Sequence, residues 1–210
     1  MIKAIIFDLG GVIIRLNDVS VPIGRFEEIG FKDAGKYMGI YSHQGIFKDL
    51  ESGAIDADGF LKELAELSGK ESISYEEAEF AWMGYLKDVP HERLDNLLEL
   101  KKRYRLFLLS NLNPFFGKWV KSTDFSGDGH PIGHYLEKDF YSYELKDYKP
   151  SASIFLKVLE ATGLKAEECI FVDDGPANVA SAEALGMKGL LVPKDADWMP
   201  TLSGMLESEQ

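Results

Sequence analysis

The first apolar segment of the chain has the length of a strand and stops at an acid. Residues 4–7 form a continuous apolar run, AIIF, and Asp8 follows directly. A run of this kind is typical of a parallel strand that is buried on both faces. Gly10 and Gly11 come next and favour a sharp turn in which the backbone approaches a ligand closely. We therefore expect Asp8 at the carboxyl edge of a sheet, where open α/β folds bind their ligands.

The segment that follows, residues 15–89, has a helical pattern and no strong strand. One amphipathic helix is expected between a cap at Asp56 and a stop at Gly69. Its apolar face consists of Phe60, Leu61, Leu64 and Leu67. Ser74 and Glu77 have the spacing of a capping box, which predicts the start of another helix. The apolar side of that helix includes Phe80, Ala81 and Tyr85. The whole segment is expected to be a helical insert.

Two parts of the chain have weaker patterns. Residues 31–45 are rich in Gly and Tyr, and they predict no more than a short helix lining a cleft. The tail from Lys194 onward is acidic and poorly patterned.

Beyond residue 89, strands and helices alternate. The expected strands are residues 104–109, 140–143, 169–172 and 188–192. The helices are expected to open near Pro90, Pro114, Ser151 and Pro176. Strands alternating with helices of this length indicate right-handed βαβ units and a parallel sheet covered on both faces. The predicted fold class is therefore α/β. It has a Rossmann-like parallel sheet core at residues 1–14 and 90–210, and a small helical domain at residues 15–89 inserted after the first strand.

Composition and charge narrow the functions open to such a fold. The 210 residues are 45% hydrophobic, which is enough for one domain with an insertion. A net charge of -12 argues against nucleic acid or an anionic membrane as partner. One cysteine excludes an internal disulfide and fits a reducing compartment. No apolar run has the length of a signal peptide or a bilayer span, so we expect a cytoplasmic protein. It is expected to be a monomer or a homodimer.

Polar residues stand at the ends of several expected strands. They are Asp8, residues 110–111, the turn at residues 144–149, and residues 173–174. In a doubly wound sheet these ends converge on one crevice. Three carboxylates placed together would repel one another, and Mg²⁺ resolves the repulsion because it binds carboxylate oxygens and substrate phosphate.

This arrangement predicts phosphoryl-transfer chemistry. Asp8 would bind the metal and attack phosphorus to form an aspartyl phosphate. Ser110 and Asn111 would donate hydrogen bonds to the phosphoryl oxygens, and either Lys146 or Lys149 would neutralise the charge on Asp8 and the phosphate. The expected partner is a small phosphorylated molecule.

Four segments, in order, resemble the motifs of the haloacid dehalogenase (HAD) superfamily. They are FDLGGV at residues 7–12, LLSN at 108–111, YKPSASIF at 148–155, and FVDDGPANVASAEALGM at 171–187. The resemblance covers nearly the whole chain and implies a phosphatase-like hydrolase. It also implies that residues 15–89 are a helical C1-type cap that closes over the substrate. The branch that we consider nearest contains α-D-glucose-1-phosphate phosphatases.

The resemblance implies a role for each matching residue. The metal site would consist of Asp8, the carbonyl of Gly10, Asp173 and Asp174, the last two directly or through water. The phosphate would be bound by Ser110 and Asn111 and by the backbone at Gly10 and Gly11. Lys149 would be the bridging cation beside the nucleophile Asp8.

The chain departs from the family pattern at Gly10. Most phosphatases of this family have a second aspartate there, which acts as general acid and then base, and losing such a group costs about 10²- to 10⁴-fold in rate. We therefore expect a bias toward acyl, aryl or anomeric sugar phosphates, whose leaving groups need little protonation. Alternatively, Asp18 or His43 protonates the leaving oxygen.

The preferred function is hydrolysis of a small organic phosphate, such as a sugar phosphate, with Mg²⁺. One alternative is a dehalogenase that uses the same aspartate to attack carbon; it needs no metal, so the Asp173-Asp174 pair argues against it. Another is a catalytically weak phosphate-binding or regulatory member, which Gly10 keeps open.

Overall fold

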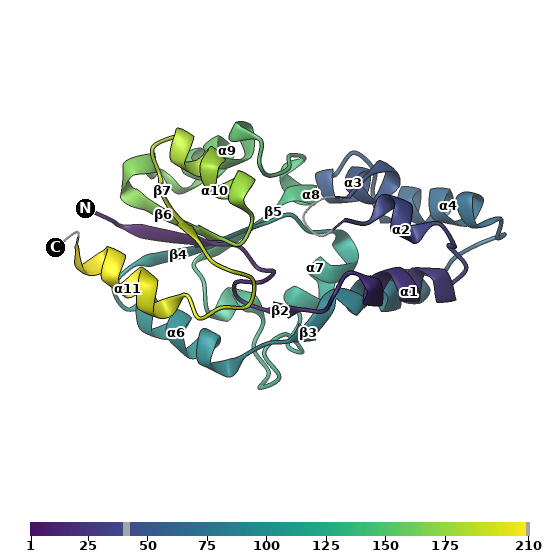
Figure 1. Ribbon diagram of the computed structural model, residues 1–210, viewed down its shortest axis with the longest axis horizontal. Helices are drawn as coiled ribbons and strands as arrows, with labels where there is room; N and C mark the ends of the chain where they lie inside the picture. Colours follow the sequence, from purple (N-terminus) through teal and green to yellow (C-terminus); the bar gives the residue numbers. More distant parts are fainter. Residues whose placement is uncertain (40–42, 209–210) are drawn as a thin grey trace.

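A parallel sheet of five strands forms the centre of the protein. The computed structural model describes residues 1–39 and 43–208. The strands are β1 (Ala4–Phe7), β4 (Arg105–Ser110), β5 (Lys138–Tyr141), β6 (Cys169–Asp173) and β7 (Lys188–Leu191). Their order is β5-β4-β1-β6-β7, and every neighbouring pair is parallel (Figure 1). The predicted α/β class with a parallel sheet is confirmed, and β1 lies in the middle of it.

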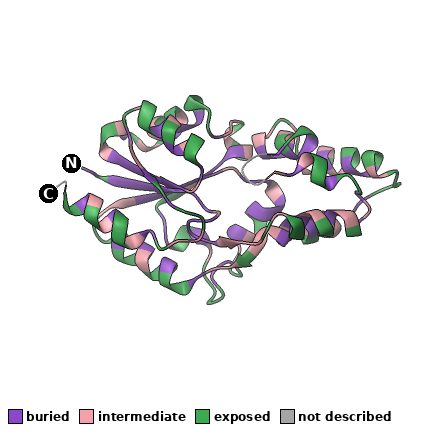
Figure 2. Cartoon of the chain, viewed as in Figure 1, coloured by how far each residue is buried: buried purple, intermediate pink, exposed green. Residues whose placement is uncertain are grey.

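Helices cover both faces of this sheet, as alternating side chains along β1 require. Ile5 and Phe7 face a cluster completed by α6 (His91–Lys101) and α11 (Met199–Glu207). Ala4 and Ile6 face the opposite cluster, which contains side chains of α9 (Ala152–Thr162) and α10 (Pro176–Ala184). Figure 2 shows the strands almost wholly buried between these layers.

The predicted helical insert after β1 is also present. Its elements are α1 (Ser20–Glu28), α2 (Ala34–Tyr37), α3 (Gly45–Ser52), α4 (Ala57–Ser68), α5 (Tyr75–Trp82) and the 3₁₀ helix η1 (Met83–Tyr85). They enclose a hydrophobic cluster of their own, in which Phe47 packs against Phe26, Phe60 and Trp82. Phe115, from α7 (Pro114–Val120) beside the sheet, joins that cluster and anchors the insert to the rest of the molecule.

The local start and stop signals in the insert are confirmed, but two of its expected core residues are not. The Asp56 carboxylate accepts a hydrogen bond from the Gly59 N–H at 2.8 Å, and Ser74 and Glu77 form the capping box. Leu67 and Phe80, in contrast, are exposed. Each lies at the edge of its apolar stripe, and a stripe alone does not show how wide the buried face is.

A short antiparallel ribbon lies at the base of the insert, where the sequence predicts no strong strand. It pairs β2 (Arg15–Leu16) with β3 (Leu86–Asp88), where the insert leaves and rejoins the core (Figure 1). The Asn17 amide donates to the carbonyls of Gly84 and Leu86 at 3.0 and 2.8 Å. Strands of two and three residues are too short to show alternation, so they have no recognisable signature in the sequence.

The tail corrects a second expectation. Residues after Lys194 include α11, and Trp198, which directly precedes it, forms a buried stripe of helical spacing with Leu202 and Leu206. Pro200 and Gly204 weakened the helical signal of this stripe.

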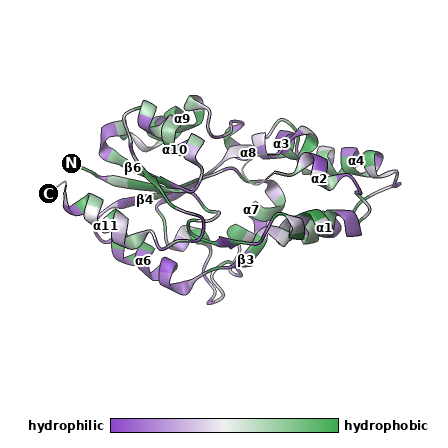
Figure 3. Cartoon of the chain, viewed as in Figure 1, coloured by the Kyte–Doolittle hydropathy of each residue, from purple (hydrophilic) through white to green (hydrophobic). Residues whose placement is uncertain are grey.

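Residues of high hydropathy concentrate along the central strands in Figure 3. No helix within residues 1–39 and 43–208 has the length and hydropathy needed to cross a bilayer.

Candidate active site

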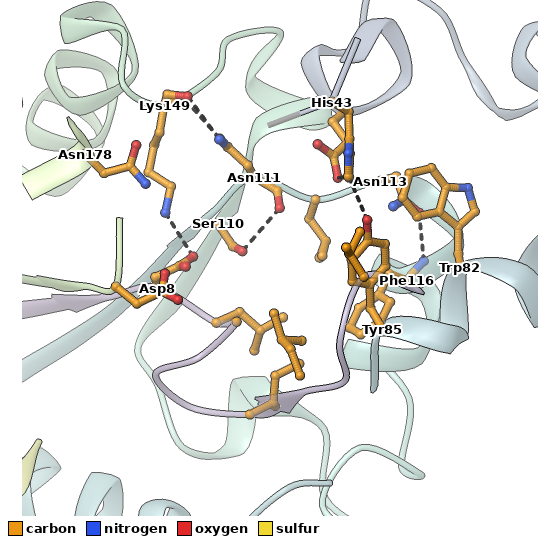
Figure 4. Close-up of a pocket in the computed structure, with 18 of the residues that line it drawn as sticks. Asp8, His43, Trp82, Tyr85, Ser110, Asn111, Asn113, Phe116, Lys149 and Asn178 are labelled. Carbon is orange, nitrogen blue, oxygen red and sulfur yellow. Dashed lines mark hydrogen bonds and ion pairs between the residues drawn. The ribbon is translucent and has the colours of Figure 1, made fainter. Parts of the chain in front are cut away.

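The carboxyl ends of the central strands open into a cavity between the sheet and the insert. Its volume is about 370 Å³, and its lining includes Asp8, Gly10, Ser110, Lys149 and Asp174. Side chains of the insert, among them His43 and Tyr85, form the opposite wall. In Figure 4, Asp8 and Lys149 lie on one side of the pocket and His43 and Tyr85 on the other. The predicted convergence of strand ends on one crevice is confirmed.

Lys149 is the cation at the centre of the carboxylate group. Its Nζ lies 2.9 Å from Asp8 Oδ1 and 2.7 Å from Asp173 Oδ2, and its side chain is buried. Lys146, the alternative considered from sequence, is exposed and has a φ of 49° just after the short helix α8 (Ser142–Leu145). The geometry therefore favours Lys149 as the bridging lysine.

Burial and charge shift the pKa values of this ion pair. Desolvation, opposed by Lys149, raises the pKa of Asp8 to about 6, and the nearby charge of Asp173 adds to the rise. Desolvation pulls the pKa of Lys149 down, but the charges of Asp173 and Asp8 outweigh it, so its pKa lies above the usual value. Lys149 therefore stays protonated and keeps Asp8 oriented.

Asp173 is hydrogen-bonded to the protein on both of its oxygens. Oδ1 accepts from the Gly175 N–H at 2.7 Å and from the Asn178 amide at 3.0 Å. Oδ2 accepts from Lys149 at 2.7 Å and from the same amide at 3.2 Å. A fully buried carboxylate with its acceptor sites used in this way is fixed in place. Asp173 is therefore better suited to fixing Lys149 and its loop than to direct metal binding.

Asp174 lies close to the turn that follows β1. A Cβ added to Gly11, which has a φ of +72°, would stand 2.5 Å from Asp174 Oδ2. Only glycine suits this conformation and this contact. Burial, together with the charges of Asp8 and Asp173, raises the pKa of Asp174 to about 7. The carboxylate is thus held against the backbone of residues 10–11 with little compensating charge.

The donor set fits Mg²⁺. Oxygens of Asp8, Asp173 and Asp174 lie within 4.8 Å of one another, the only group of this kind among the described residues. One lysine contacts two of the three carboxylates, which leaves the cluster with excess negative charge. A hard divalent cation with oxygen ligands relieves that excess.

Ser110 and Asn111 lie at the end of β4, as predicted, and their side chains differ in how many hydrogen bonds they already make. The Ser110 hydroxyl has one long contact, 3.5 Å to the Asn111 carbonyl, and faces the cavity. The Asn111 amide donates to the Lys149 carbonyl at 3.0 Å and accepts from the Lys149 N–H at 2.9 Å. The Asn111 side chain, which also interacts with Tyr148, therefore positions Lys149.

The two alternative proton donors, Asp18 and His43, both line the cavity, and Asp18 is the less suited of the two. Asp18 is exposed, and its carboxylate accepts from the Ser20 N–H at 2.9 Å, which lowers its pKa. An acid ionised at neutral pH is a poor proton donor. His43 lies at the insert end, facing Glu51 and Tyr85. The predicted short helix is present as α2 but does not line the cavity, and residues 40–42 lie outside the described residues.

Several lining residues were not identified from the sequence. They include Glu51, Tyr85, Asn178 and Lys194. Glu51 had a usable signal, because it lies four residues after Phe47 and therefore on the buried face of α3. Asn178 lies in the first turn of α10, where its side chain reaches back to Asp173. Nothing in the local sequence distinguishes Lys194 from a surface lysine.

Known proteins with similar sequences support the interpretation of this site. Residues 2–186 match the haloacid dehalogenase-like hydrolases. A D-ribitol-5-phosphate phosphatase from Bacteroides thetaiotaomicron is 38% identical over 99% of this chain and 100% of its own length.

Similar solved structures point the same way. A HAD-like family hydrolase from Porphyromonas gingivalis, 38% identical, superposes with a TM-score of 0.93 over 98% of both chains. A HAD family enzyme from Bacteroides thetaiotaomicron, in complex with magnesium and inorganic phosphate, is 34% identical and gives 0.86 over 96% of this chain and 99% of its own.

Proposed function

Since this chain belongs to the haloacid dehalogenase-like hydrolases and is a Mg²⁺-dependent phosphatase among them, we propose that its substrate is a small polyol or sugar phosphate. The observation that carries this proposal is the cluster of Asp8, Asp173 and Asp174 around Lys149 at the mouth of the cavity. Carboxylates in this arrangement suit phosphoryl transfer and leave room for one small organic phosphate.

Asp8 is the nucleophile in this proposal. Its carboxylate oxygen attacks phosphorus, the bond between phosphorus and the leaving oxygen breaks, and water then hydrolyses the aspartyl phosphate. Lys149 holds the Asp8 carboxylate in position and offsets the charge of the incoming phosphate. Asp173 and Asn178 position Lys149 rather than touching the substrate.

Asp8, Asp174 and the carbonyl of Gly10 are the groups that would hold Mg²⁺, with Asp173 reaching it through water. When bound, the ion supplies positive charge that reduces repulsion between the carboxylates and the phosphate. The Ser110 hydroxyl and the Asn111 amide donate hydrogen bonds to phosphoryl oxygens.

The relative from Bacteroides thetaiotaomicron favours a polyol phosphate as the substrate class. That protein is named for D-ribitol 5-phosphate, and the present chain spans its full length. A cavity of about 370 Å³ accommodates a five-carbon phosphate of that kind. Similarity to the α-D-glucose-1-phosphate phosphatase branch remains a prediction, and glucose 1-phosphate is included in the substrate panel below to test it.

Position 10 bears on how the leaving group is protonated. A Cβ at Gly10 would stand 2.8 Å from Leu16 Cδ1, so the end of the Leu16 side chain fills the space where an acid would begin. Without a carboxylate there, we expect alkyl phosphates to react more slowly than acyl or aryl phosphates of equal binding. A flat dependence of kcat/KM on leaving-group pKa would contradict this expectation.

The test of the function is phosphate release from a panel of substrates with Mg²⁺ or with EDTA. The panel contains D-ribitol 5-phosphate, D-ribose 5-phosphate, glucose 1-phosphate, glucose 6-phosphate, p-nitrophenyl phosphate and acetyl phosphate. We expect Mg²⁺-dependent release from wild type and from Asp58→Asn, an exposed acid on α4, and none from Asp8→Asn. Release in EDTA, or from Asp8→Asn, would contradict the proposal.

Location and assembly are also proposals. The single cysteine and the net charge of -12 support a cytoplasmic protein with no nucleic-acid or membrane partner. We propose a monomer or homodimer, which sedimentation velocity distinguishes.

A further inference from the structure

Four polar side chains meet at the end of the cavity that is farther from Asp8. His43 precedes α3, Glu51 lies on α3, Tyr85 ends η1, and Tyr148 belongs to the sheet side of the cavity, next to Lys149. All four line the same cavity as the carboxylate cluster. We call them the distal tetrad. In Figure 4, His43 and Tyr85 face the pocket across from Asp8 and Lys149.

Glu51 is a buried carboxyl without a lysine or arginine partner among the described residues. Its Oε2 accepts from the Tyr148 hydroxyl at 3.2 Å, and its Oε1 lies 3.6 Å from His43 Nε2. Burial raises its pKa, against the opposing effect of His43. Burying a carboxyl costs free energy that its side-chain hydrogen bonds with Tyr148 and Asn113 offset only in part. A side chain of this cost, facing a cavity, indicates a ligand.

The distal tetrad also has unused hydrogen-bonding capacity. His43 Nδ1 is buried without a hydrogen-bond partner among the described residues, and the imidazole is nine-tenths buried. The Tyr85 hydroxyl lies 3.4 Å from His43 Nε2, and the 3.6 Å between His43 and Glu51 is too long for a hydrogen bond. A ligand with several hydroxyl groups can both donate to Glu51 and accept from the imidazole or phenol.

The charges along the cavity favour a ligand whose end farther from the phosphate is uncharged. Of the residues that the structure describes, Lys149 and Lys194 are the lysines lining the cavity, and both act on its acidic end. Lys149 contacts Asp8, and the charge of Lys194 lowers the pKa of Asp174. At the other end of the cavity, the charged side chain of the distal tetrad is a carboxyl, Glu51, instead of a lysine. A carboxylate or second phosphate at that end of a ligand would face the Glu51 carboxyl with no lysine or arginine beside it.

We propose that the distal tetrad recognises the hydroxyl groups at the end of the substrate away from its phosphate, with Glu51 accepting from them. It selects a neutral polyhydroxylated chain and rejects one that ends in an acid. The side chains of Trp82 and Phe116 line the same cavity and pack against the C–H faces of that chain. This inference rests on the proposed phosphatase function and names the group that reads its substrate.

The test compares three substrates of equal chain length on wild type and Glu51→Gln. They are D-ribitol 5-phosphate, pentyl phosphate, which lacks the hydroxyl groups, and D-ribonate 5-phosphate, which ends in a carboxylate. In Glu51→Gln we expect the ratio of kcat/KM for ribitol 5-phosphate over pentyl phosphate to fall about 10- to 100-fold, mainly through KM. The discrimination against ribonate 5-phosphate falls with it. The matched control is Glu63→Gln, an exposed glutamate of α4, which keeps both ratios.

Ratios separate recognition from a structural role, because a misfolded site slows all three substrates together. Tyr148→Phe removes one hydroxyl and nothing else, so its ribitol-to-pentyl ratio falls about fivefold even where Glu51→Gln fails to fold. Equal ratios in wild type, Tyr148→Phe and any folded Glu51→Gln would overturn the inference while leaving the phosphatase intact. Absence of Mg²⁺-dependent release from acetyl phosphate by wild type would overturn both.

Discussion

Lys149 determines the charge balance of the active site. It is the lysine that contacts both Asp8 and Asp173, and it is 2% exposed. In Lys149→Met, two buried carboxylates lose their counter-ion, an unpaired state that costs about 3–5 kcal/mol. We expect kcat/KM to fall at least about 10³-fold and the Mg²⁺-free protein to unfold at lower urea. The exposed Lys146, in Lys146→Met, serves as the control and retains both properties. Activity in Lys149→Met near that of the control would contradict the role.

The raised pKa values of Asp8 and Asp174 predict how Mg²⁺ affinity depends on pH. Asp8 has a pKa of about 6 and Asp174 of about 7 without metal, so both are largely protonated at low pH. Mg²⁺ binds their ionised forms and must displace these protons. We therefore expect the affinity for Mg²⁺ to rise from about pH 5.5 to about pH 8. Isothermal titration calorimetry measures this affinity and the protons that are released on binding. Affinity that is constant over this interval would contradict it.

Gly11 provides a matched test of the contact with Asp174. Gly11 and Gly69 have φ values of +72° and +65°, so an alanine is strained by about 1 kcal/mol at either. Only at Gly11 does the new methyl meet a carboxylate oxygen, at 2.5 Å; nothing lies within 4 Å at Gly69. Gly11→Ala should weaken Mg²⁺ binding about tenfold or more, while Gly69→Ala only lowers the melting temperature. Equal Mg²⁺ affinity in the two variants would show that Asp174 is not held at this turn.

Much of the candidate site could be predicted from single residues. Asp8, Ser110 and Asp173 follow buried apolar runs, and strand ends meet at one edge of a parallel sheet. The bridging lysine was implied only by the family resemblance, which indicated Lys149. The strand pattern alone left it open, because Lys146 and Lys149 lie three positions apart in one turn. Their orientation depends on the left-handed φ at Lys146 and on the Asn111 amide, which are tertiary details.

At the scale of elements, α6 connects the turn after β1 to the segment after β7. The Arg93 guanidinium on α6 donates to the carbonyls of Val12, Asp195 and Ala196 at 2.9, 2.8 and 3.3 Å. The indole N–H of Trp198 donates to the same Val12 carbonyl at 2.9 Å. Arg93 therefore holds together two segments that line the acidic end of the cavity.

Removing Arg93 should loosen both segments. In Arg93→Met the carbonyls of Val12 and Asp195 lose a charged donor, so we expect a loss of about 2–4 kcal/mol in the free energy of unfolding by urea denaturation. The value of kcat should fall with it, because residues 10–12 carry part of the metal site. Arg103→Met, an exposed arginine just beyond α6, is the control. Full stability in Arg93→Met would show that the connection is not needed.

Elements with local signals were predicted better than those that depend on distant partners. The caps at Asp56 and Ser74 are confirmed. They could be predicted because the residues that form each cap lie within four positions of one another. The ribbon of β2 and β3 joins Arg15 to Asp88 across the whole insert, and so has no local signature. The exposure of Leu67 likewise depends on how much of α4 the neighbouring helices cover.

For the whole molecule, the cavity lies between two separately packed parts. The insert has its own aromatic cluster, and the sheet has one cluster on each face. The alternation of strands and helices predicted this architecture. It could not predict that Tyr148 meets Glu51 from 97 positions away, since that contact depends on how the insert rests on the sheet. The sequence therefore predicted the catalytic end of the cavity better than the distal tetrad, of which it indicated only His43.

The most direct test of the central claim is to find the phosphoryl group on Asp8. Wild-type protein is mixed with D-ribitol 5-phosphate and Mg²⁺, quenched in acid within the first turnover, digested, and examined by tandem mass spectrometry. We predict one added phosphoryl group on the peptide containing Asp8, absent with EDTA and absent in Asp8→Asn. Phosphate release at the wild-type rate by Asp8→Asn, or a phosphoryl group on another residue, would contradict the account.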